Sequence, residues 1–156
     1  MVKKFKLFWK NYLFQSFLAT LTMFITLLLL SIEHAVIITS IGASAFIVFA
    51  MPKDITAKPK NVIGSHLIGL FSGSLCSLIP HSSLLYSLVV YSLAVGLSIF
   101  LMVITSTEHP PASGTSLGVA ISGFNSKVAI GVITSTFILS LIHYFFKPYL
   151  RDLKDL

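Results

Sequence analysis

The chain alternates between long apolar runs and short segments that carry most of its charges. Four runs are each about as long as the roughly 20 residues that an α-helix needs to cross a bilayer. These runs are 12–32, 62–80, 84–105 and 127–147. Two further runs, 34–50 and 109–124, are shorter and are interrupted by Gly, Ser or Pro. The pattern predicts an all-α membrane protein with four complete membrane helices and two short, broken ones.

The composition agrees with this class of protein. Hydrophobic residues make up 55% of the 156 residues and charged residues only 10%, whereas a soluble domain carries about 25% charged residues. We expect one transmembrane domain over residues 1–156 that is surrounded by the lipid bilayer. The net charge of +6 does not indicate a nucleic-acid partner, because the cations lie in short loops and tails beside the apolar runs.

The positions of the Lys and Arg residues predict the topology. If all six segments cross and the N-terminus is cytoplasmic, ten of the eleven Lys and Arg residues lie inside, and only Lys127 lies outside. If 109–124 did not cross, the cations near the C-terminus would move to the outside. We therefore expect six crossings of the cell (inner) membrane, with both termini in the cytoplasm.

The two halves of the chain repeat the same order of segments. Each half reads long run, Glu-His pair, short broken run, long run, with Glu33-His34 in the first half and Glu108-His109 in the second. Because each half has three crossings, the halves enter the membrane from opposite faces. We expect a 3+3 inverted repeat, with halves at about 12–80 and 84–147. Chance similarity and close packing of small residues are the alternative explanation of this pattern.

Pro110 and Pro111 place the start of a helix inside the second short segment. Proline disrupts a helix interior but is favoured in the first helical turn, and the residue before a proline is pushed towards extended geometry. We expect an extended stretch at 109–113 and then a half-helix from about Gly114 to Gly123. Such a half-helix would begin near the midplane of the membrane.

We expect the first short segment to follow the same plan. An irregular stretch from His34 to Ser40 would lead into a half-helix from about Gly42 to Ala50. Inverted symmetry would then aim the N-termini of the two half-helices at each other near the midplane. In transporters, short Gly- or Pro-interrupted segments at matching places in two inverted halves point to the binding site.

Two facing helix N-termini favour a small anion as the ligand. Each presents unpaired N–H groups and about half a positive charge, and such an end is a ready anion site. No Lys or Arg is expected at this depth, so dipoles and hydroxyls would hold the anion. The expected substrate-binding residues are Ser113, Gly114, Thr115 and Ser116 on one side and Gly42, Ala43 and Ser44 on the other.

Several titratable residues near the broken segments are candidates for gating or proton coupling. They are Glu33, His34, His66, Glu108 and His109. As structural alternatives, the carboxylates would be solvated or would cap helices, and the histidines would hydrogen-bond across helices or pack against the prolines. The scattered histidines and the single cysteine predict no metal site. No cofactor or catalytic motif is visible, so we expect no enzyme.

Three stretches follow one another along the chain: I-G-A-S-A-F-I-V-F-A-M-P (41–52), K-P-K-N-V-I-G-S-H-L-I-G (58–69) and E-H-P-P-A-S-G-T-S-L-G (108–118). Together they resemble the HPP family of integral membrane proteins, which is named for its His-Pro-Pro motif. The resemblance covers about residues 12 to 147. The family pattern often continues H-P-P-G-G-A-T-A, whereas A-S-G-T-S follows the prolines here, which reduces local backbone freedom.

The resemblance implies a membrane protein whose plastid and cyanobacterial relatives have been linked to nitrite transport. Nitrite is a small monovalent anion, so it fits the ligand expected at the half-helices. We therefore expect transport of a small monovalent inorganic anion, with nitrite as the first candidate, by a homo-oligomer such as a dimer or trimer. Two alternatives stay open: a channel or transporter for a cation or neutral solute, with Glu33 and Glu108 as ligands, and a non-transporting membrane scaffold subunit.

Overall fold

The computed structural model describes residues 2–29, 35–80 and 82–153. In these ranges the chain forms six α-helices, two short 3-10 turns and no strand, which confirms the all-α fold. The helices are α1 (Val2–Leu29), α2 (Ala35–Ala50), α3 (Pro59–Ser77), α4 (Leu84–Ile104), α5 (Ala112–Ser122) and α6 (Ser126–Phe146). The 3-10 turns are η2 (Ile55–Ala57) and η3 (Lys147–Tyr149).

Within the described ranges, three helical segments are long and apolar enough to cross a membrane. They are Leu7–Leu28 in α1, Leu84–Ile104, which is α4, and Ser126–Tyr149, which comprises α6 and η3. Helix α2 is apolar but has only 16 residues, and α3 carries Ser, Gly, His and Asn along its 19 residues. Helix α5 has 11 residues, which at 1.5 Å each is about half of the roughly 30 Å hydrocarbon layer. Three of the four predicted complete spans are thus found, in α1, α4 and α6. The fourth, 62–80, corresponds to α3, which is not among the segments apolar enough to count as a span.

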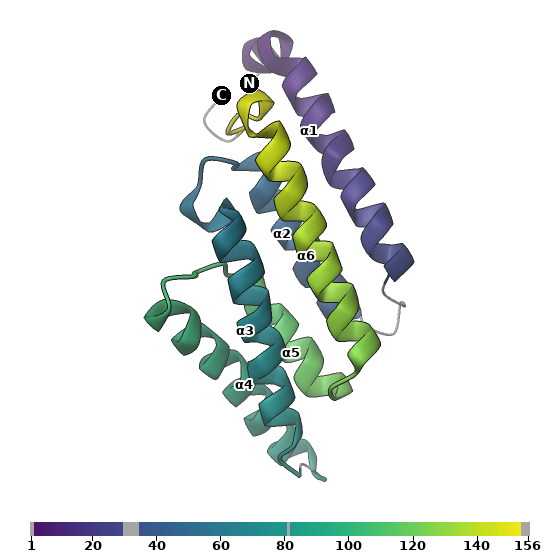
Figure 1. Cartoon of the computed structure of the whole chain (residues 1–156), viewed down its shortest axis with the longest axis vertical. Coiled ribbons are helices and arrows are strands. Elements are labelled where there is room, and N and C mark those ends of the chain that lie inside the picture. Colours follow the sequence, from purple (N-terminus) through teal and green to yellow (C-terminus); the bar gives the residue numbers. More distant parts are fainter. Residues whose placement is uncertain (1, 30–34, 81, 154–156) are drawn as a thin grey trace.

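The helices run alternately up and down, so that both termini lie at the same end of the molecule (Figure 1). Helices α1 and α4 occupy opposite edges of the bundle: α1 packs on α2 and α6, whereas α4 packs on α3 and α5. The four inner helices are joined by contacts of α2 with α5 and α6, and of α3 with α5 and α6.

The main helix contacts follow a twofold pattern. Exchanging α1 with α4, α2 with α5 and α3 with α6 turns each main contact between helices into another main contact, except that α2–α5 and α3–α6 are each turned into themselves. The two helices of every exchanged pair also run in opposite directions (Figure 1). Two inverted units of three helices would produce this pattern of packing and direction.

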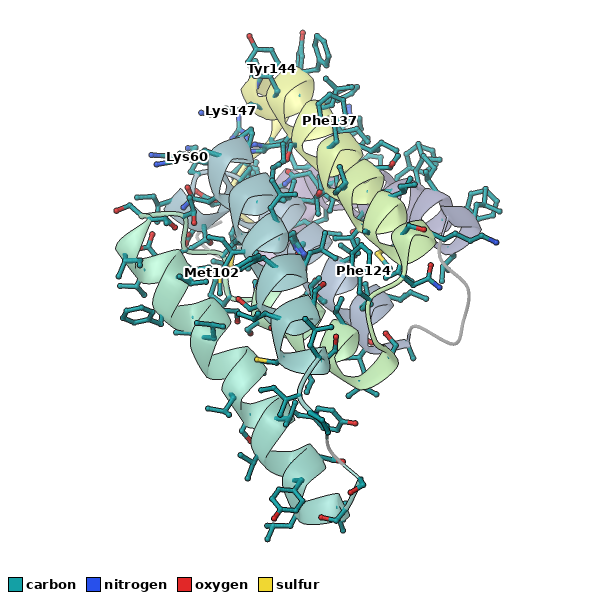
Figure 2. All side chains as sticks on the ribbon, turned by 60° about the horizontal axis from the view of Figure 1, so that its bottom comes forward. Lys60, Met102, Phe124, Phe137, Tyr144 and Lys147 are labelled. Carbon is teal, nitrogen blue, oxygen red and sulfur yellow. The ribbon has the colours of Figure 1, made fainter. Side chains whose placement is uncertain are left out.

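Hydrogen bonds join three distant parts of the chain at the end that carries the termini. The Gln15 side chain of α1 donates to the Phe49 carbonyl and, at 2.8 Å, to the Arg151 carbonyl. The Leu153 amide donates to the Ala50 carbonyl at 2.9 Å. Lys60 and Lys147 also lie towards this end (Figure 2). The start of α3, which carries Lys60, and the segment directly after α6, which carries Lys147, therefore lie towards the same end. The orientation of this end in the membrane remains a prediction.

Helix α2 begins earlier than the sequence predicted. It is regular from Ala35 to Ala50, so the expected irregular stretch up to Ser40 and the helix start near Gly42 are wrong for the described residues. Thr39 and Ser44 donate to the carbonyls four residues before them. These hydroxyls are therefore satisfied inside a helix without breaking it. Glu33 and His34 lie outside the described residues.

Helix α5 also begins before the predicted position, at Ala112 rather than Gly114. Pro110 and Pro111 form a turn, and Pro111 already has helical angles (φ −56°, ψ −29°). The amides of residues 112–114 donate to the carbonyls of residues 109–111. The expected extended stretch over 109–113 is therefore wrong. The first amides of α5 are paired within this turn and are not free to hold an anion in this conformation.

The segment that contains α5 is bounded by two residues with left-handed backbone angles. Ser106 has φ +51° and precedes it, and Gly123 has φ +76° and follows it. Such angles are uncommon for residues other than glycine. The chain thus turns sharply on both sides of α5, which sets this short helix apart from α4 and α6.

Candidate functional site

Five buried side chains form one hydrogen-bonded group, here called the polar cluster, where α2, α3 and α5 meet. Its members are Ser40 and Ser44 of α2, His66 of α3, His109 before α5 and Thr115 of α5. Each of these side chains is at most 5% exposed. Polar groups so deeply buried in a protein are stable only when they are hydrogen-bonded.

Ser44 is the centre of the polar cluster. Its Oγ lies 2.9 Å from His66 Nε2 and 2.8 Å from His109 Nε2. It also lies 3.0 Å from the Ser40 carbonyl oxygen one turn earlier in α2. The two imidazole rings are 5.5 Å apart between centroids. One hydroxyl therefore bridges two histidines that come from different parts of the chain.

Thr115 and Ser40 extend the cluster to the start of α5. Thr115 Oγ1 lies 2.8 Å from His66 Nδ1 and 2.9 Å from Ser40 Oγ. Ser40 Oγ donates to the Pro111 carbonyl at 2.6 Å. The turn that the two prolines form is thereby tied to α2, and Thr115 fixes the ring of His66 against α5.

The second imidazole of the cluster, that of His109, is held by the loop between α2 and α3. Its Nδ1 donates to the Thr56 carbonyl at 2.7 Å. Asp54 Oδ1 in turn accepts from the Thr56 amide at 2.9 Å and from the Thr56 hydroxyl at 2.8 Å. The adjacent Glu108 carbonyl accepts from the side chain of Asn61 at 3.1 Å. The loop that carries His109 is thus anchored to η2 through Thr56 and to α3 through Asn61.

Glycines let the three helices approach closely enough to build the cluster. A Cβ atom at Gly69 or Gly73 of α3 would lie 2.5 Å from a backbone oxygen of α5, that of Ala112 or Ser116 respectively. On the other side of α5, a Cβ at Gly114 would lie 3.2 Å from Ser40 Cβ. Small residues four apart on a membrane helix commonly allow such close packing. Side chains as short as Ser and Thr can therefore reach the histidines.

The structure brings together four of the residues that the sequence singled out: Ser44, His66, His109 and Thr115. Ser40 joins them, although it was not among the predicted site residues. The sequence does contain a sign of this role, because Ser40 and Ser44 are four residues apart and so lie on one face of a helix. Reading residues 35–40 as irregular concealed that spacing.

Other predicted site residues lie elsewhere. Ser113 donates to the Pro110 carbonyl, and Ser116 donates to the Ala94 carbonyl of α4. The nearest contact for a Cβ at Gly42 is Met23 of α1, and Ala43 is exposed. Glu108 is half-buried, and no hydrogen bond is found between its carboxylate and the cluster among the described residues. The binding roles predicted for these positions remain predictions.

The polar cluster contains no fixed negative charge within the part of the chain that the structure describes. Its hydrogen-bonding groups are hydroxyls, imidazoles and backbone carbonyls. The described residues also contain no group of three or more His, Cys, Asp or Glu residues that could hold a metal ion.

A second set of buried polar atoms lies along α3 and α6, which pack together. Among the described residues, four such side-chain atoms have no hydrogen-bond partner. They are Ser72 Oγ on α3 and Ser135 Oγ, Ser140 Oγ and His143 Nδ1 on α6. The other ring nitrogen of His143 is bonded to the Pro52 carbonyl at 2.9 Å. None of these four atoms takes part in the hydrogen bonds of the polar cluster.

Together, the fold and this site define an integral membrane protein whose helices enclose a buried polar cluster. The chain belongs to the HPP family: the family model of the HPP transmembrane region matches residues 5–151. This match confirms the resemblance seen in the sequence.

Two relatives from Dictyostelium discoideum, both described as transmembrane proteins, are similar to part of the chain. One is 38% identical over 92 residues, which cover 56% of this chain and 31% of the relative. The other is 32% identical over 85 residues, which cover 54% of this chain and 27% of the relative. The chain therefore matches less than a third of the length of these proteins. No solved structure matches the chain.

Proposed function

We propose that this protein transports a small monovalent inorganic anion across the membrane, with nitrite as the first candidate, by binding it in the polar cluster. The observation that carries the proposal is the cluster itself: three hydroxyls and two imidazoles buried where three helices meet. Polar and ionisable groups inside a membrane protein are costly and mark substrate pathways. The choice of nitrite comes from the family resemblance, because plastid and cyanobacterial relatives have been linked to nitrite transport. Nitrite is also a small monovalent anion, which suits such a site.

The burial of the cluster favours a carrier over an open pore. Its side chains are at most 5% exposed, so an anion reaches them only when helices move apart. The twofold pattern of helix contacts supports an inverted repeat of α1–α3 and α4–α6. In transporters with such repeats, one repeat rocks against the other around a central site. The polar cluster joins α2 and α3 of one half to α5 of the other, which is where this motion would open it.

The distribution of cations supports the orientation of the protein. The segment between α2 and the start of α3 carries Lys53, Lys58 and Lys60, and the segment after α6 carries Lys147 and Arg151. Both segments lie at the end of the molecule where the N and C marks stand (Figure 1). Cytoplasmic loops of membrane proteins carry an excess of Lys and Arg. The proposed transporter therefore has this end in the cytoplasm, and the α3–α4 and α5–α6 turns face the opposite side.

Uptake into proteoliposomes tests the function. Nitrite, nitrate, formate and chloride would be supplied to vesicles containing wild-type protein, Ser44→Ala or Ser98→Ala, with protein-free vesicles subtracted. Ser98 of α4 is a matched control because it is fully buried but donates only to the Val95 carbonyl of its own helix. We expect saturable nitrite uptake by the wild type and Ser98→Ala. Ser44→Ala should lower it at least about tenfold, because two imidazoles lose a shared partner.

Folded protein that takes up none of the four anions would contradict the proposal. If the same vesicles instead conducted a cation such as potassium, the alternative of a cation pathway would replace it. Equal uptake by Ser44→Ala and the wild type would show that the anion binds outside the polar cluster.

A further inference from the structure

A groove lies between the first helix and the end of the last one. It is lined by Lys10, Asn11 and Phe14 of α1, Phe146 of α6 and Tyr149 of η3, and its volume is about 380 Å³. The rings of Phe14 and Phe146 pack together, with centroids 5.7 Å apart. The groove thus has an apolar wall from each of two helices that are far apart in the sequence.

The groove lies where two apolar spans end. The spans that include α1 and α6 begin at Leu7 and end at Tyr149, at the end of the molecule where the N and C marks stand (Figure 1). Trp9, Tyr144 and Tyr149 are exposed near these span ends, and Trp and Tyr are enriched at membrane–water interfaces. We therefore expect the groove at the level of the lipid headgroups.

The lining of the groove changes from polar to apolar towards the membrane. Lys10 and Phe14 are four residues apart, so they share one face of α1, and Phe14 lies about 6 Å deeper at 1.5 Å per residue. On the other wall, Tyr149 of η3 lies beyond Phe146, the last residue of α6. A phospholipid has the same order, with a charged headgroup outside and acyl chains inside.

Positive charge gathers around the groove. Lys10 lines it, and Lys147 belongs to η3, the same short turn as Tyr149. The Arg151 guanidinium lies 5.5 Å from the centre of the Phe8 ring, close to the start of α1. A headgroup in the groove would therefore lie near several cations.

The elements that line the groove supply no negative charge. Helices α1 and α6 and the turn η3 contain no Asp or Glu. Asp152 follows shortly after η3, but its Oδ1 accepts from the Lys53 amide at 3.1 Å, in the segment after α2. Asp155 lies outside the described residues. This charge favours an anionic headgroup over a zwitterionic one, whose ammonium group the cations would repel.

We propose that this groove binds one anionic phospholipid, such as phosphatidylglycerol. Its phosphate would lie beside Lys10 and Asn11, whose ammonium and amide groups donate hydrogen bonds. One acyl chain would lie along Phe14 and Phe146. Basic pockets between membrane helices bind anionic headgroups in this way. The proposal does not depend on which solute the protein transports.

Such a lipid would also hold α1 to the bundle. Helix α1 lies at an edge and packs on α2 and α6. Gln15, the neighbour of Phe14, donates to the Arg151 carbonyl at 2.8 Å and so ties α1 to the segment after η3. A lipid between α1 and the end of α6 would add a second link at the same level. A ligand that binds only the folded state stabilises it, so the lipid should raise the melting temperature.

Native mass spectrometry of the purified, delipidated protein tests the proposal. Phosphatidylglycerol and phosphatidylcholine with identical acyl chains would be titrated in a neutral detergent. We expect one phosphatidylglycerol per chain, with an affinity at least about fivefold higher than that of phosphatidylcholine, since each Lys or Arg near an anionic lipid contributes about 1 kcal/mol. Glycerol phosphate, which has no acyl chains, should not compete at the same concentrations because it makes no apolar contact.

Lys10→Gln is expected to lower the affinity for phosphatidylglycerol about fivefold and to leave that for phosphatidylcholine unchanged. Lys10 is exposed, so the variant should fold. Lys127→Gln is the matched control, because it removes the same charge from an exposed position at the start of α6, at the other end of that helix. It should bind phosphatidylglycerol like the wild type.

A cross-linking measurement locates the lipid independently of the variants. Phosphatidylglycerol with a photoreactive group in an acyl chain should label the peptides that contain Phe14 or Phe146. Equal binding of both lipids, an equal loss in both variants, or labelling confined to other peptides would overturn the proposal. Competition by glycerol phosphate would assign the groove to a soluble phosphate ester instead. Lipid-free pairs of chains that separate in Lys10→Gln would assign it to a second copy of the chain.

Discussion

Replacing Gly73 with alanine is expected to separate α5 from α3 and to destabilise the protein by about 3 kcal/mol, at the upper end of the usual effect of overpacking. An added Cβ would lie 2.5 Å from the Ser116 carbonyl oxygen and 2.8 Å from Val119 Cβ. The carbonyl belongs to the backbone of α5 and cannot rotate away. The short helix would have to shift as a whole, which would also pull Thr115 away from His66.

Cys76 gives a direct readout of this loosening. It is the only cysteine of the chain and is buried with Val90, Ala94 and Ala120. A dye that fluoresces on reaction with a thiol should therefore label Gly73→Ala at a clearly lower temperature than wild-type protein in the same detergent. Gly42→Ala is the control, because its Cβ would meet only the flexible Met23 side chain, at 3.6 Å. Equal labelling temperatures for Gly73→Ala and the wild type would show that α3 and α5 are not packed as closely as described.

Replacing Thr115 with valine is expected to remove most transport while leaving the fold in place. The substitution keeps the shape of the side chain but deletes the hydroxyl that contacts His66 Nδ1 and Ser40 Oγ. An imidazole nitrogen that is left unpaired in the interior costs about 1–3 kcal/mol. The ring of His66 would lose its fixed orientation, so we expect nitrite uptake to fall at least about tenfold, a change that corresponds to about 1.4 kcal/mol.

Thr136→Val is the matched control for this prediction. Thr136 of α6 is as deeply buried, at 1% exposure, but its hydroxyl donates to the Val132 carbonyl of its own helix. We expect its uptake to stay near the wild-type value and its thiol-labelling temperature to change little. If both variants lost uptake equally, the loss would reflect a general need for buried hydroxyls and not the polar cluster.

The long helices could be predicted from the sequence because their apolar runs are continuous. The runs 84–105 and 127–147 correspond to α4 at Leu84–Ile104 and α6 at Ser126–Phe146. The short segments were harder to predict. Ser40, Gly42 and Ser44 lower the hydropathy of α2, but a helix depends on its backbone hydrogen bonds, and Ser44 donates back to the Ser40 carbonyl. Low hydropathy there marks a buried polar face and not a break.

The site could be predicted only in part for a related reason. The sequence places three hydroxyl residues within four positions after the prolines, at 113, 115 and 116. Only Thr115 contacts a histidine, while Ser116 donates to the Ala94 carbonyl of α4 and Ser113 donates to the Pro110 carbonyl of its own turn. The direction of each side chain depends on where α5 begins and on which glycines let α3 approach. Those are tertiary contacts that one sequence does not reveal.

Binding of nitrite to the polar cluster can be observed directly by nuclear magnetic resonance. The five histidines would be labelled with nitrogen-15 in their rings, and their signals would be assigned by replacing one histidine at a time. Titration with nitrite should shift the signals of His66 and His109 saturably and leave that of His143 unchanged. If uptake by the same preparation saturates with nitrite while the signals of His66 and His109 do not move, the anion does not bind in the polar cluster.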